Sequence, residues 1–196
     1  MRRVVITGSG TINALGHDVA TTLEAMREGR CGIGPLNIRD VDRLAIKIGG
    51  QVTDYDEQTH FNRQQISLYD RFTQFTLLAA AQAIGEAGLT FSGALADRSG
   101  VVLGTSGGGL NTQDENYRAV YEEGKNRVHP FIVPKLMNNA AASHVSMQYN
   151  LRGPTFTVAT ACASSTPAIG PARSISRSDP ADLIVTRGPV SIIAHR

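Results

Sequence analysis

Cysteine is scarce in this chain, which contains only Cys31 and Cys162 among 196 residues and has no Cys-x-x-Cys pair or zinc-ligand spacing. The scarcity argues against a disulfide framework and a metal site, and it favours a reduced, cytoplasmic compartment. Long apolar runs are also missing, since none approaches the roughly 18 residues that a membrane span needs. Because Met1, Arg2 and Arg3 lead directly into a short strand, we expect no signal peptide and no membrane span.

A strong charge of either sign is absent as well. Charged residues make up 18% of the sequence, hydrophobic residues make up 41%, and the formal net charge is +2. These values argue against long disordered segments, an acidic tail and a nucleic-acid-binding surface. No low-complexity segment and no repeat with a period of about 20 to 50 residues is present. A chain of this length buries roughly 70% of its unfolded surface, which is enough for one solid core.

The hydrophobic pattern alternates strand-like with helix-like segments. The expected strands are 4–7, 101–103, 154–160 and 183–186, with a further edge strand over 46–52. The expected helices are 19–28, 70–87, 112–123 and 135–149, with another one opening after residue 162. Asp18 should cap the first helix and Gly29 should end it. The apolar face of this helix comprises Val19, Leu23 and Met26. Such alternation predicts an α/β layer architecture with right-handed crossovers.

A lone thiol follows one of these strands. Cys162 comes after a strand-like run that ends at Thr160, and its neighbours are alanine and serine, which are too small to shield it. If a helix opens at Ala163, its positive end and free backbone N–H groups favour the thiolate, which is the form that attacks carbonyl carbon. The pattern therefore indicates a nucleophile. It also fits a small buried hydrophobic residue, which is what most free cysteines are.

Two glycine-rich segments resemble nucleotide-binding loops only in composition. Gly8 and Gly10 follow a strand, but the next glycine is Gly16, so the spacing of a dinucleotide fingerprint fails. The second segment, 104–109, lacks the Gly-Lys-Ser/Thr of a phosphate-binding loop. We therefore expect no cofactor.

Six segments together resemble one enzyme family in their order and spacing. They are VVITGSG (4–10), DRFTQF (70–75), LGTSGGGL (103–110), NNAAASH (138–144), RGP (152–154) and TACASS (160–165). Over roughly residues 2 to 170, the chain resembles the β-ketoacyl-acyl carrier protein synthases of the type II, elongating kind. The resemblance implies a thiolase-like fold, which consists of two similar halves of mixed sheet and helices. Residues 1–196 match the first half only.

The resemblance also implies a mechanism. In this family a cysteine accepts an acyl group from acyl carrier protein, and two histidines then assist the decarboxylation of malonyl-carrier protein so that the carbanion attacks the thioester. Cys162 matches the nucleophile, and its backbone N–H matches one oxyanion donor. The two histidine motifs and the second oxyanion donor belong to the second half and have no match here. Their loss should abolish condensation, because each such group contributes about 10²-fold or more in rate.

None of the chain's own histidines is expected to replace them. The candidates are His17, His60, His129, His144 and His195. His144 occupies a position that the family often fills with His or Gln, within the expected helix 135–149, which favours a packing or solvent-facing role. His129 precedes Pro130 in a loop, and His195 is among the last two residues, where order is often lost.

The resemblance assigns further residues to substrate binding. Gly107 and Gly108 match a segment that faces the acyl pocket, and elongating enzymes commonly hold a bulky residue, often Ile, where this chain has Gly107. The missing side chain indicates a parent enzyme that accepts long or bulky acyl chains, and the alternative is a glycine required by backbone geometry. Ile132, Val133 and Met137 match the segment that reaches the neighbouring subunit's pocket, because family members are homodimers.

The sequence departs from the family directly after the nucleophile. Family members usually have His-Ala-Ile-Gly where this chain begins with Pro167, and Pro171 follows within a turn. A proline inside a helix costs roughly 3 kcal/mol. The helix therefore either contains Pro167 at this cost or begins later, with Ser165 as its N-cap. A later start would leave Cys162 about one turn from the helix dipole. Residues 171–196 depart further from the family pattern.

Two functions follow from this reading. The first is that of a β-ketoacyl-acyl carrier protein synthase, an acyltransferase that performs a Claisen condensation in fatty-acid elongation and is catalytically incomplete in this chain. The second is a noncatalytic fragment that folds and associates without turnover. The expected partners are acyl carrier protein loaded with acyl and malonyl groups and a second copy of the chain, but no nucleic acid and no membrane. The apolar residues after Pro130 favour the homodimer.

Overall fold

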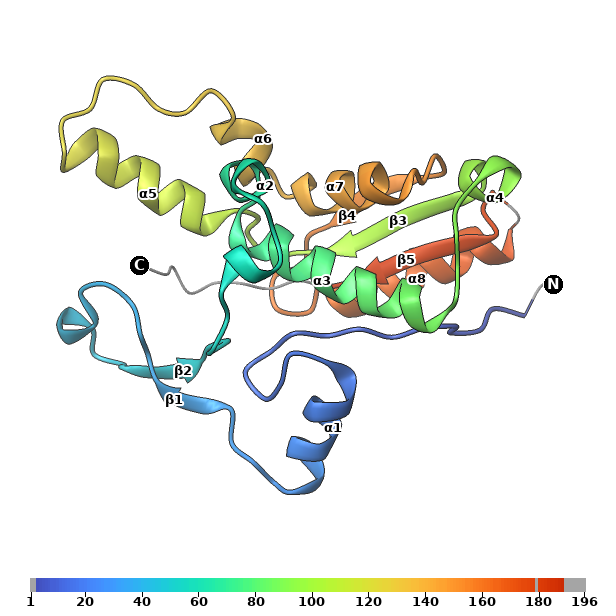
Figure 1. Cartoon of the computed structure of the whole chain (residues 1–196), viewed down its shortest axis with the longest axis horizontal. Coiled ribbons are helices and arrows are strands. Elements are labelled where there is room, and N and C mark those ends of the chain that lie inside the picture. The colour runs from blue at the N-terminus through green and yellow to red at the C-terminus, as the bar shows by residue number, and fades with distance from the viewer. Residues whose placement is uncertain (1–2, 179, 189–196) are drawn as a thin grey trace.

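The structure, a computed structural model, describes residues 3–178 and 180–188 (Figure 1). The helices are α1 (Val19–Arg27), α2 (Arg63–Leu68), α3 (Arg71–Glu86), α4 (Gly93–Asp97), α5 (Leu110–Tyr121), α6 (Ile132–Leu136), α7 (Ala140–Tyr149) and α8 (Ser165–Arg177), with short 3₁₀ turns η1 (Val41–Arg43) and η2 (Glu57–Thr59). The strands are β1 (Ile33–Pro35), β2 (Ile48–Gly50), β3 (Ser99–Gly104), β4 (Thr155–Val158) and β5 (Leu183–Arg187). Within the described ranges, no helix has both the length and the apolar character needed to cross a membrane.

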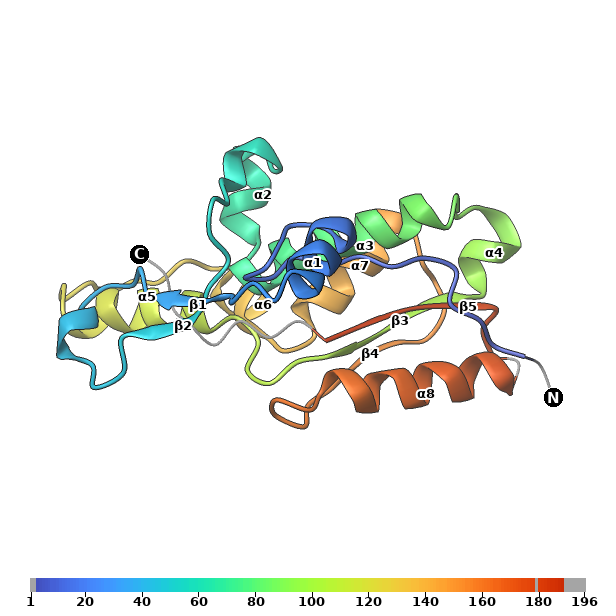
Figure 2. The ribbon, with the colours of Figure 1, turned by 90° about the horizontal axis from the view of Figure 1, so that it is seen from below.

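A three-stranded parallel sheet lies at the centre, with the strand order β4-β3-β5. Val101 of β3 pairs with Thr155 on one side and with Val185 on the other. Helices α3 and α7 lie over one face of this sheet and α8 lies over the other, as Figure 2 shows. These layers confirm the predicted α/β architecture, and the three strands confirm those expected at 101–103, 154–160 and 183–186.

Strand β3 is buried along its whole length. Because successive side chains of a strand point to opposite faces, one strand supplies the core on both sides of the sheet. Val101 and Leu103 pack into the cluster formed with α3 and α7, whereas Val102 packs against Ala168 and Ala172 of α8. The buried residues that α8 contributes to this contact are both alanine, and Ile175 of the same helix packs beside them, partly buried.

The first helix has the expected ends, and its apolar face is largely exposed. The Asp18 side chain accepts a hydrogen bond from the Thr21 backbone N–H, and Gly29 follows the helix with a φ of 67°. The exposed fractions of Leu23 and Met26 are 44% and 62%, and only Ala25 is buried within the helix. The apolar face of this helix is therefore largely exposed, because the described elements leave this side of α1 uncovered.

The edge strand expected over 46–52 is shorter than predicted and belongs to a separate ribbon. Only Ile48–Gly50 pairs, and its antiparallel partner is Ile33–Pro35. Ile33, Ile46 and Ile48 remain exposed on this ribbon. The ribbon therefore lies outside the parallel sheet that carries Cys162.

The buried strand predicted at the N-terminus is wrong. The segment 4–7 is extended but forms no strand, and the exposed fractions of Val5 and Ile6 are 60% and 92%. It lies alongside β5 in Figure 1, and an apolar cavity of about 330 Å³ separates it from β5 and α8. The outer edge of β5 has no partner among the described strands, and the cavity keeps the segment too far from that edge to pair with it.

The helix predicted over 135–149 is divided in two. Helix α6 ends at Leu136, Met137 is extended with a ψ of 143°, and α7 begins at Ala140. The break lets the Leu136 carbonyl oxygen accept a hydrogen bond from the Gly109 backbone N–H at 2.9 Å. The interruption therefore attaches this part of the chain to the loop that follows β3.

The helix after Cys162 begins late, close to the second of the two predicted alternatives. Its N-cap is Ser164 rather than Ser165, and Pro167 lies in the first turn, where proline is tolerated. Pro171 lies inside the helix. Residues 189–196, which include His195 and the end of the tail expected to depart from the family pattern, lie outside the described residues.

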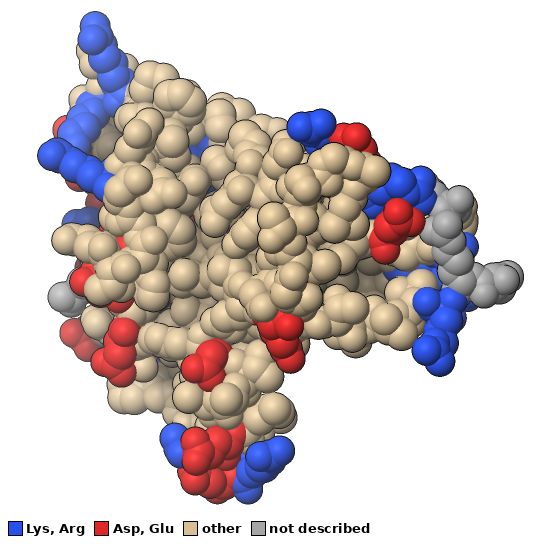
Figure 3. Space-filling view, turned by 45° about the vertical axis from the view of Figure 1, so that its right-hand side comes forward, with Lys and Arg blue, Asp and Glu red and all other residues tan. Residues whose placement is uncertain are grey.

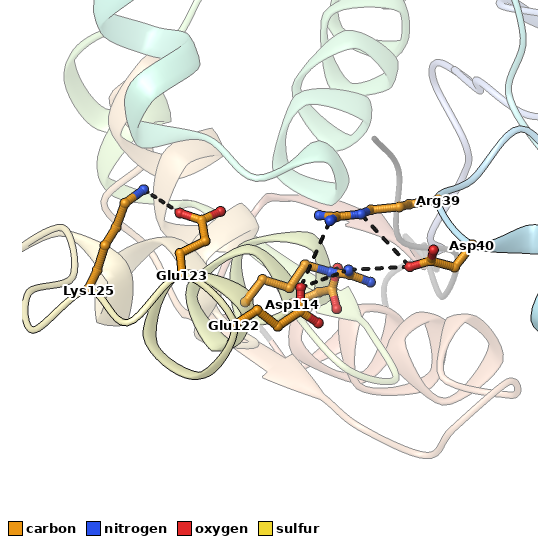
Figure 4. A network of polar contacts seen from close by, with 7 residues as sticks. Arg39, Asp40, Asp114, Glu122, Glu123 and Lys125 are labelled. Atoms are coloured by element: carbon orange, nitrogen blue, oxygen red, sulfur yellow. Dashed lines mark hydrogen bonds and ion pairs between the residues drawn. The ribbon is translucent and has the colours of Figure 1, made fainter.

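A surface network of ion pairs attaches α5 to the segment before η1 (Figure 4). Arg118 contacts Asp114 at 2.8 Å and Glu122 at 3.5 Å on its own helix, and it contacts Asp40 at 3.6 Å on the other segment. Arg39 lies 4.0 Å from Glu122. Because α5 follows the glycine-rich loop directly, the network helps to fix the direction in which that loop leaves the sheet.

Candidate functional site

Cys162 lies in the loop between the end of β4 at Val158 and the start of α8 at Ser165. The loop leaves the carboxyl edge of the parallel sheet, which is where ligands commonly bind in open α/β sheets. The cysteine is exposed. The exposure contradicts the alternative that Cys162 is a small buried hydrophobic residue.

The backbone turns sharply immediately before the thiol. Ala161 has a φ of 50°, in the left-handed region that is strained for a residue with a Cβ atom. Ala163 N donates to Thr160 O at 3.2 Å, and Ser164 N donates to Ala161 O at 3.1 Å. Strain of this kind persists only when surrounding groups hold it, so the contacts of residues 160–164 determine where Cys162 lies.

Ser164 connects this turn to the end of β3. Its side chain is fully buried, and its hydroxyl oxygen accepts a hydrogen bond from Thr160 N at 2.9 Å. The hydroxyl lies 2.6 Å from the Ala161 carbonyl oxygen and 3.2 Å from that of Thr105. A Cβ atom on Gly104 would lie 2.0 Å from the Ser164 carbonyl oxygen, so only glycine permits this approach. The Cys162 loop and the end of β3 are therefore in direct contact.

The glycine-rich loop after β3 places Gly107 and Gly108 at the same edge of the sheet. Gly108 has a φ of 63°, and a Cβ atom there would lie 2.5 Å from the Leu136 carbonyl oxygen, so backbone geometry requires this glycine. Gly107 has no positive φ, and a Cβ atom there would meet Leu110 Cδ1 at 3.1 Å. Backbone conformation therefore does not account for Gly107, and Leu110 borders the space that a larger side chain would enter.

Helix α6 contacts this edge of the sheet through the backbone hydrogen bond from Gly109 N–H to the Leu136 carbonyl oxygen. Ile132 is half-buried and lines a cavity of about 330 Å³ together with His129 and Lys135, which does not include Cys162. The exposed fractions of Val133 and Met137 are 56% and 42%. The structure thus brings together the loops of Cys162 and Gly107–Gly108, and it leaves Val133 and Met137 facing solvent.

Comparisons with known proteins agree with this arrangement. A family model described as the beta-ketoacyl synthase N-terminal domain matches residues 1–194. The chain belongs to this family. It is 34% identical over 194 residues to 3-oxoacyl-[acyl-carrier-protein] synthase 2 of Staphylococcus aureus (strain N315), and this alignment covers 99% of the chain and 47% of that protein. It is 39% identical over 187 residues to nodulation protein E of Rhizobium sp. (strain N33), with 95% of the chain and 46% of that protein covered.

Solved structures confirm the thiolase-like fold of the first half. A ketosynthase solved in complex with its type II PKS acyl-carrier protein has a TM-score of 0.83 at 20% sequence identity, covering 99% of this chain and 52% of that one. The chain therefore spans about half the length of the family members it matches.

Four histidines of this ketosynthase half have structural contacts of their own. His17 Nε2 lies 2.7 Å from the Thr53 carbonyl oxygen, His60 stacks on Tyr55, and His129 Nδ1 accepts a hydrogen bond from Phe131 N at 3.2 Å. His144 packs edge-on against Tyr69 with 4.5 Å between ring centroids. Of the packing and solvent-facing roles that the sequence left open for His144, the structure shows packing.

Asp70 is a structural residue of the site whose role the sequence did not predict. It is buried, and one of its carboxylate oxygens accepts hydrogen bonds from the backbone N–H and the hydroxyl of Thr112, both at 2.7 Å. The other oxygen accepts from Phe72 N at 3.3 Å. Asp70 therefore joins the start of α3 to α5. Its position before a helix was the available signal, but that signal indicated only a local cap.

A polar cleft of about 360 Å³ lies behind the glycine-rich loop. Its charged lining residues are Glu57, Asp70, Arg71, Glu115 and Lys135. The Arg71 guanidinium lies 4.6 Å from the centre of the Tyr55 ring, in a cation–π contact. No group of three or more His, Cys, Asp or Glu side chains suited to a metal ion occurs among the residues that the structure describes.

Gly104→Ala should lower the free energy of unfolding by about 1–3 kcal/mol or more, because the new methyl group overlaps the Ser164 carbonyl. Gly85→Ala in α3 is the matched control, since a Cβ atom there meets nothing within 4 Å. It should stabilise the protein by about 0.5–1 kcal/mol. Urea unfolding measures both changes, and a Gly104→Ala protein as stable as the wild type would contradict the close approach.

The pH dependence of stability should include His144, because burial lowers the pKa of its imidazole from 6.5. The unfolded chain then binds a proton more readily than the folded chain, so the free energy of unfolding decreases as the pH falls through 6.5. His144→Gln should reduce this decrease. Urea unfolding at about pH 8 and pH 5.5 tests it. An equal loss of stability in variant and wild type would show that His144 is not the cause.

Proposed function

We propose that this chain carries the acyl-accepting part of a β-ketoacyl-acyl carrier protein synthase, with Cys162 as the nucleophile. The observation that supports the proposal is the exposed thiol in a strained turn at the carboxyl edge of the sheet, in a chain that belongs to this family. A sharp turn between a strand and a helix is a common way to present a nucleophile to a substrate.

The proposed reaction is acyl transfer between two sulfur atoms. The thiolate of Cys162 attacks the carbonyl carbon of an acyl thioester, and the new sulfur–carbon bond forms as the bond to the carrier's sulfur breaks. The proton that left Cys162 ends on the carrier thiol. The Cys162 backbone N–H would stabilise the oxyanion that forms on the way.

We infer that the substrate is delivered by acyl carrier protein. A related ketosynthase has been solved in complex with such a carrier, which supports the same partner here. The acyl chain would pass Gly107 and Gly108, whose loop contacts the same end of β3 as the Cys162 loop. Ile132, Val133 and Met137 would contact the acyl chain from a second copy of the protein.

A homodimer would also cover apolar surface. Tyr121, Phe131, Val133 and Met137 are exposed along α5 and α6 by 81%, 51%, 56% and 42%. Figure 3 shows a different side of the molecule, the right-hand side of Figure 1 turned forward, where charged side chains lie mainly toward the rim. Both cysteines are free, which supports a location in the reducing cytoplasm.

The proposed activity of the chain alone ends at the acyl-enzyme. Condensation in this family needs two histidines and a second oxyanion donor, and the described histidines hold other contacts. Each missing group contributes about 10²-fold or more. The chain should therefore accept an acyl group without releasing CO₂ from malonyl-carrier protein.

Incubation with a medium-chain acyl-carrier protein should add one acyl group to Cys162, as detected by intact-protein and peptide mass spectrometry. Cys162→Ala should abolish the adduct, and Cys31→Ala should retain it because Cys31 lies in the separate ribbon region. A folded chain that gains no acyl group would instead support the noncatalytic fragment. Release of CO₂ at a family-like rate would contradict the proposed incompleteness.

Gly107→Ile should restrict the length of the acyl chain that Cys162 accepts. The new side chain would enter the space bordered by Leu110, so acylation by a sixteen-carbon thioester should fall by about 10-fold or more relative to a six-carbon one. Gly34→Ile is the control, because a Cβ atom there meets nothing within 4 Å and Gly34 lies in β1. A length profile that Gly107→Ile leaves unchanged would contradict the role of Gly107.

A further inference from the structure

Ser164 occupies the N-cap position of α8 but does not cap it with its side chain. An N-cap serine normally accepts a hydrogen bond from the backbone N–H of the second or third helical residue. The third residue is Pro167, which has no N–H, and the N–H of the second, Thr166, donates to Ala163 O at 3.1 Å. The residue that departs from the family pattern thus leaves the Ser164 hydroxyl available for other contacts.

These other contacts enclose Ala161 on both sides. The hydroxyl accepts from the N–H of Thr160, which precedes Ala161, and lies within hydrogen-bond distance of the Ala161 carbonyl oxygen at 2.6 Å. A hydroxyl has one donor and two acceptor positions, so both bonds form at once. The first bond holds the Ala159–Thr160 peptide and the second holds the Ala161–Cys162 peptide, so Ala161 with its strained φ of 50° lies between two tethered peptides directly before Cys162.

The same side chain lies against the end of the buried central strand β3. Its oxygen is 3.2 Å from Thr105 O, and Thr105 N continues the pairing of β3 with β4 by donating to Val158 O at 3.0 Å. The Ser164 backbone is confined by Gly104 at the end of the fully buried strand β3. Ser164 therefore holds the Cys162 loop against the end of the central strand β3.

We infer that Ser164 is a positioning residue for acyl transfer to Cys162, an inference that rests on the proposed function. Removing its hydroxyl takes away the partner of Thr160 N–H and frees Ala161 to relax to a negative φ, which rotates the peptide before Cys162. Reaction with a bound thioester requires the sulfur to lie within about 3–3.5 Å of the carbonyl carbon along the right direction. A small alkylating reagent that approaches from solvent has no such requirement.

The test compares two reactions of Cys162 in the full chain, acylation by acyl-carrier protein and alkylation by iodoacetamide, at a temperature where each variant is folded by circular dichroism. Ser164→Ala should slow acylation by about 10-fold or more while changing alkylation much less. Ser164→Thr keeps the hydroxyl and should retain most of the acylation rate. Ser99→Ala is the matched control, because Ser99 is also fully buried and bonds a backbone carbonyl, Leu95 O at 2.6 Å, at the opposite end of β3.

Each outcome decides the inference. The inference is overturned if Ser164→Ala is acylated at the wild-type rate. It is also overturned if the acylation of Ser99→Ala is slowed as much as that of Ser164→Ala. A wild-type chain that is never acylated overturns the proposed function and the inference with it. If Ser164→Ala does not fold, Pro167→Ala replaces it, since the restored N–H competes for the Ser164 hydroxyl. The acylation rate should then decrease by less than in Ser164→Ala, and an unchanged acylation rate would overturn the inference.

Discussion

Burial of strand β3 between two helical layers is the constraint on which the site depends. Its six residues are all buried, and Val101, Val102 and Leu103 alternate between the two clusters of the core. Side chains of this size contribute about 1.5–3 kcal/mol each when fully buried. A strand held from both faces has little freedom to move, so the loop that leaves its carboxyl end begins from a fixed point.

The Cys162 loop is attached to this fixed point by close backbone contacts rather than by large side chains. Loops are usually the mobile part of a fold. Here Gly104 lets the Ser164 backbone touch β3, and Gly108 lets the break between α6 and α7 touch the glycine-rich loop. Asp70 then joins α3 to α5 from the other side. Four chain segments therefore meet at this edge of the sheet. Each contact between them depends either on a glycine, which lets two backbones approach, or on a buried hydrogen bond.

The sequence predicted the elements whose signals are local. Asp18 and Asp70 marked helix starts, and the apolar runs at 101–103 and 183–186 marked strands, because caps and hydrophobic runs act within a few residues. It failed where the answer depends on a distant partner. The pattern of 4–7 is that of a strand, yet it cannot state whether the segment will come close enough to the outer edge of β5 to pair with it. Likewise, Cys162 was identified from its neighbours and the family, whereas the role of Ser164 depends on Thr105, 59 positions away in the sequence.

The N-terminal segment has a consequence for how this protein behaves in solution. Val4, Val5 and Ile6 form a strand-prone stretch that is exposed by 40%, 60% and 92%, beside a cavity rather than a partner strand. Extended backbone with unsatisfied pairing groups is a template on which other polypeptides assemble. This stretch is therefore one of the apolar surfaces through which copies of the protein can associate as its concentration rises, beside the exposed side chains of α5 and α6.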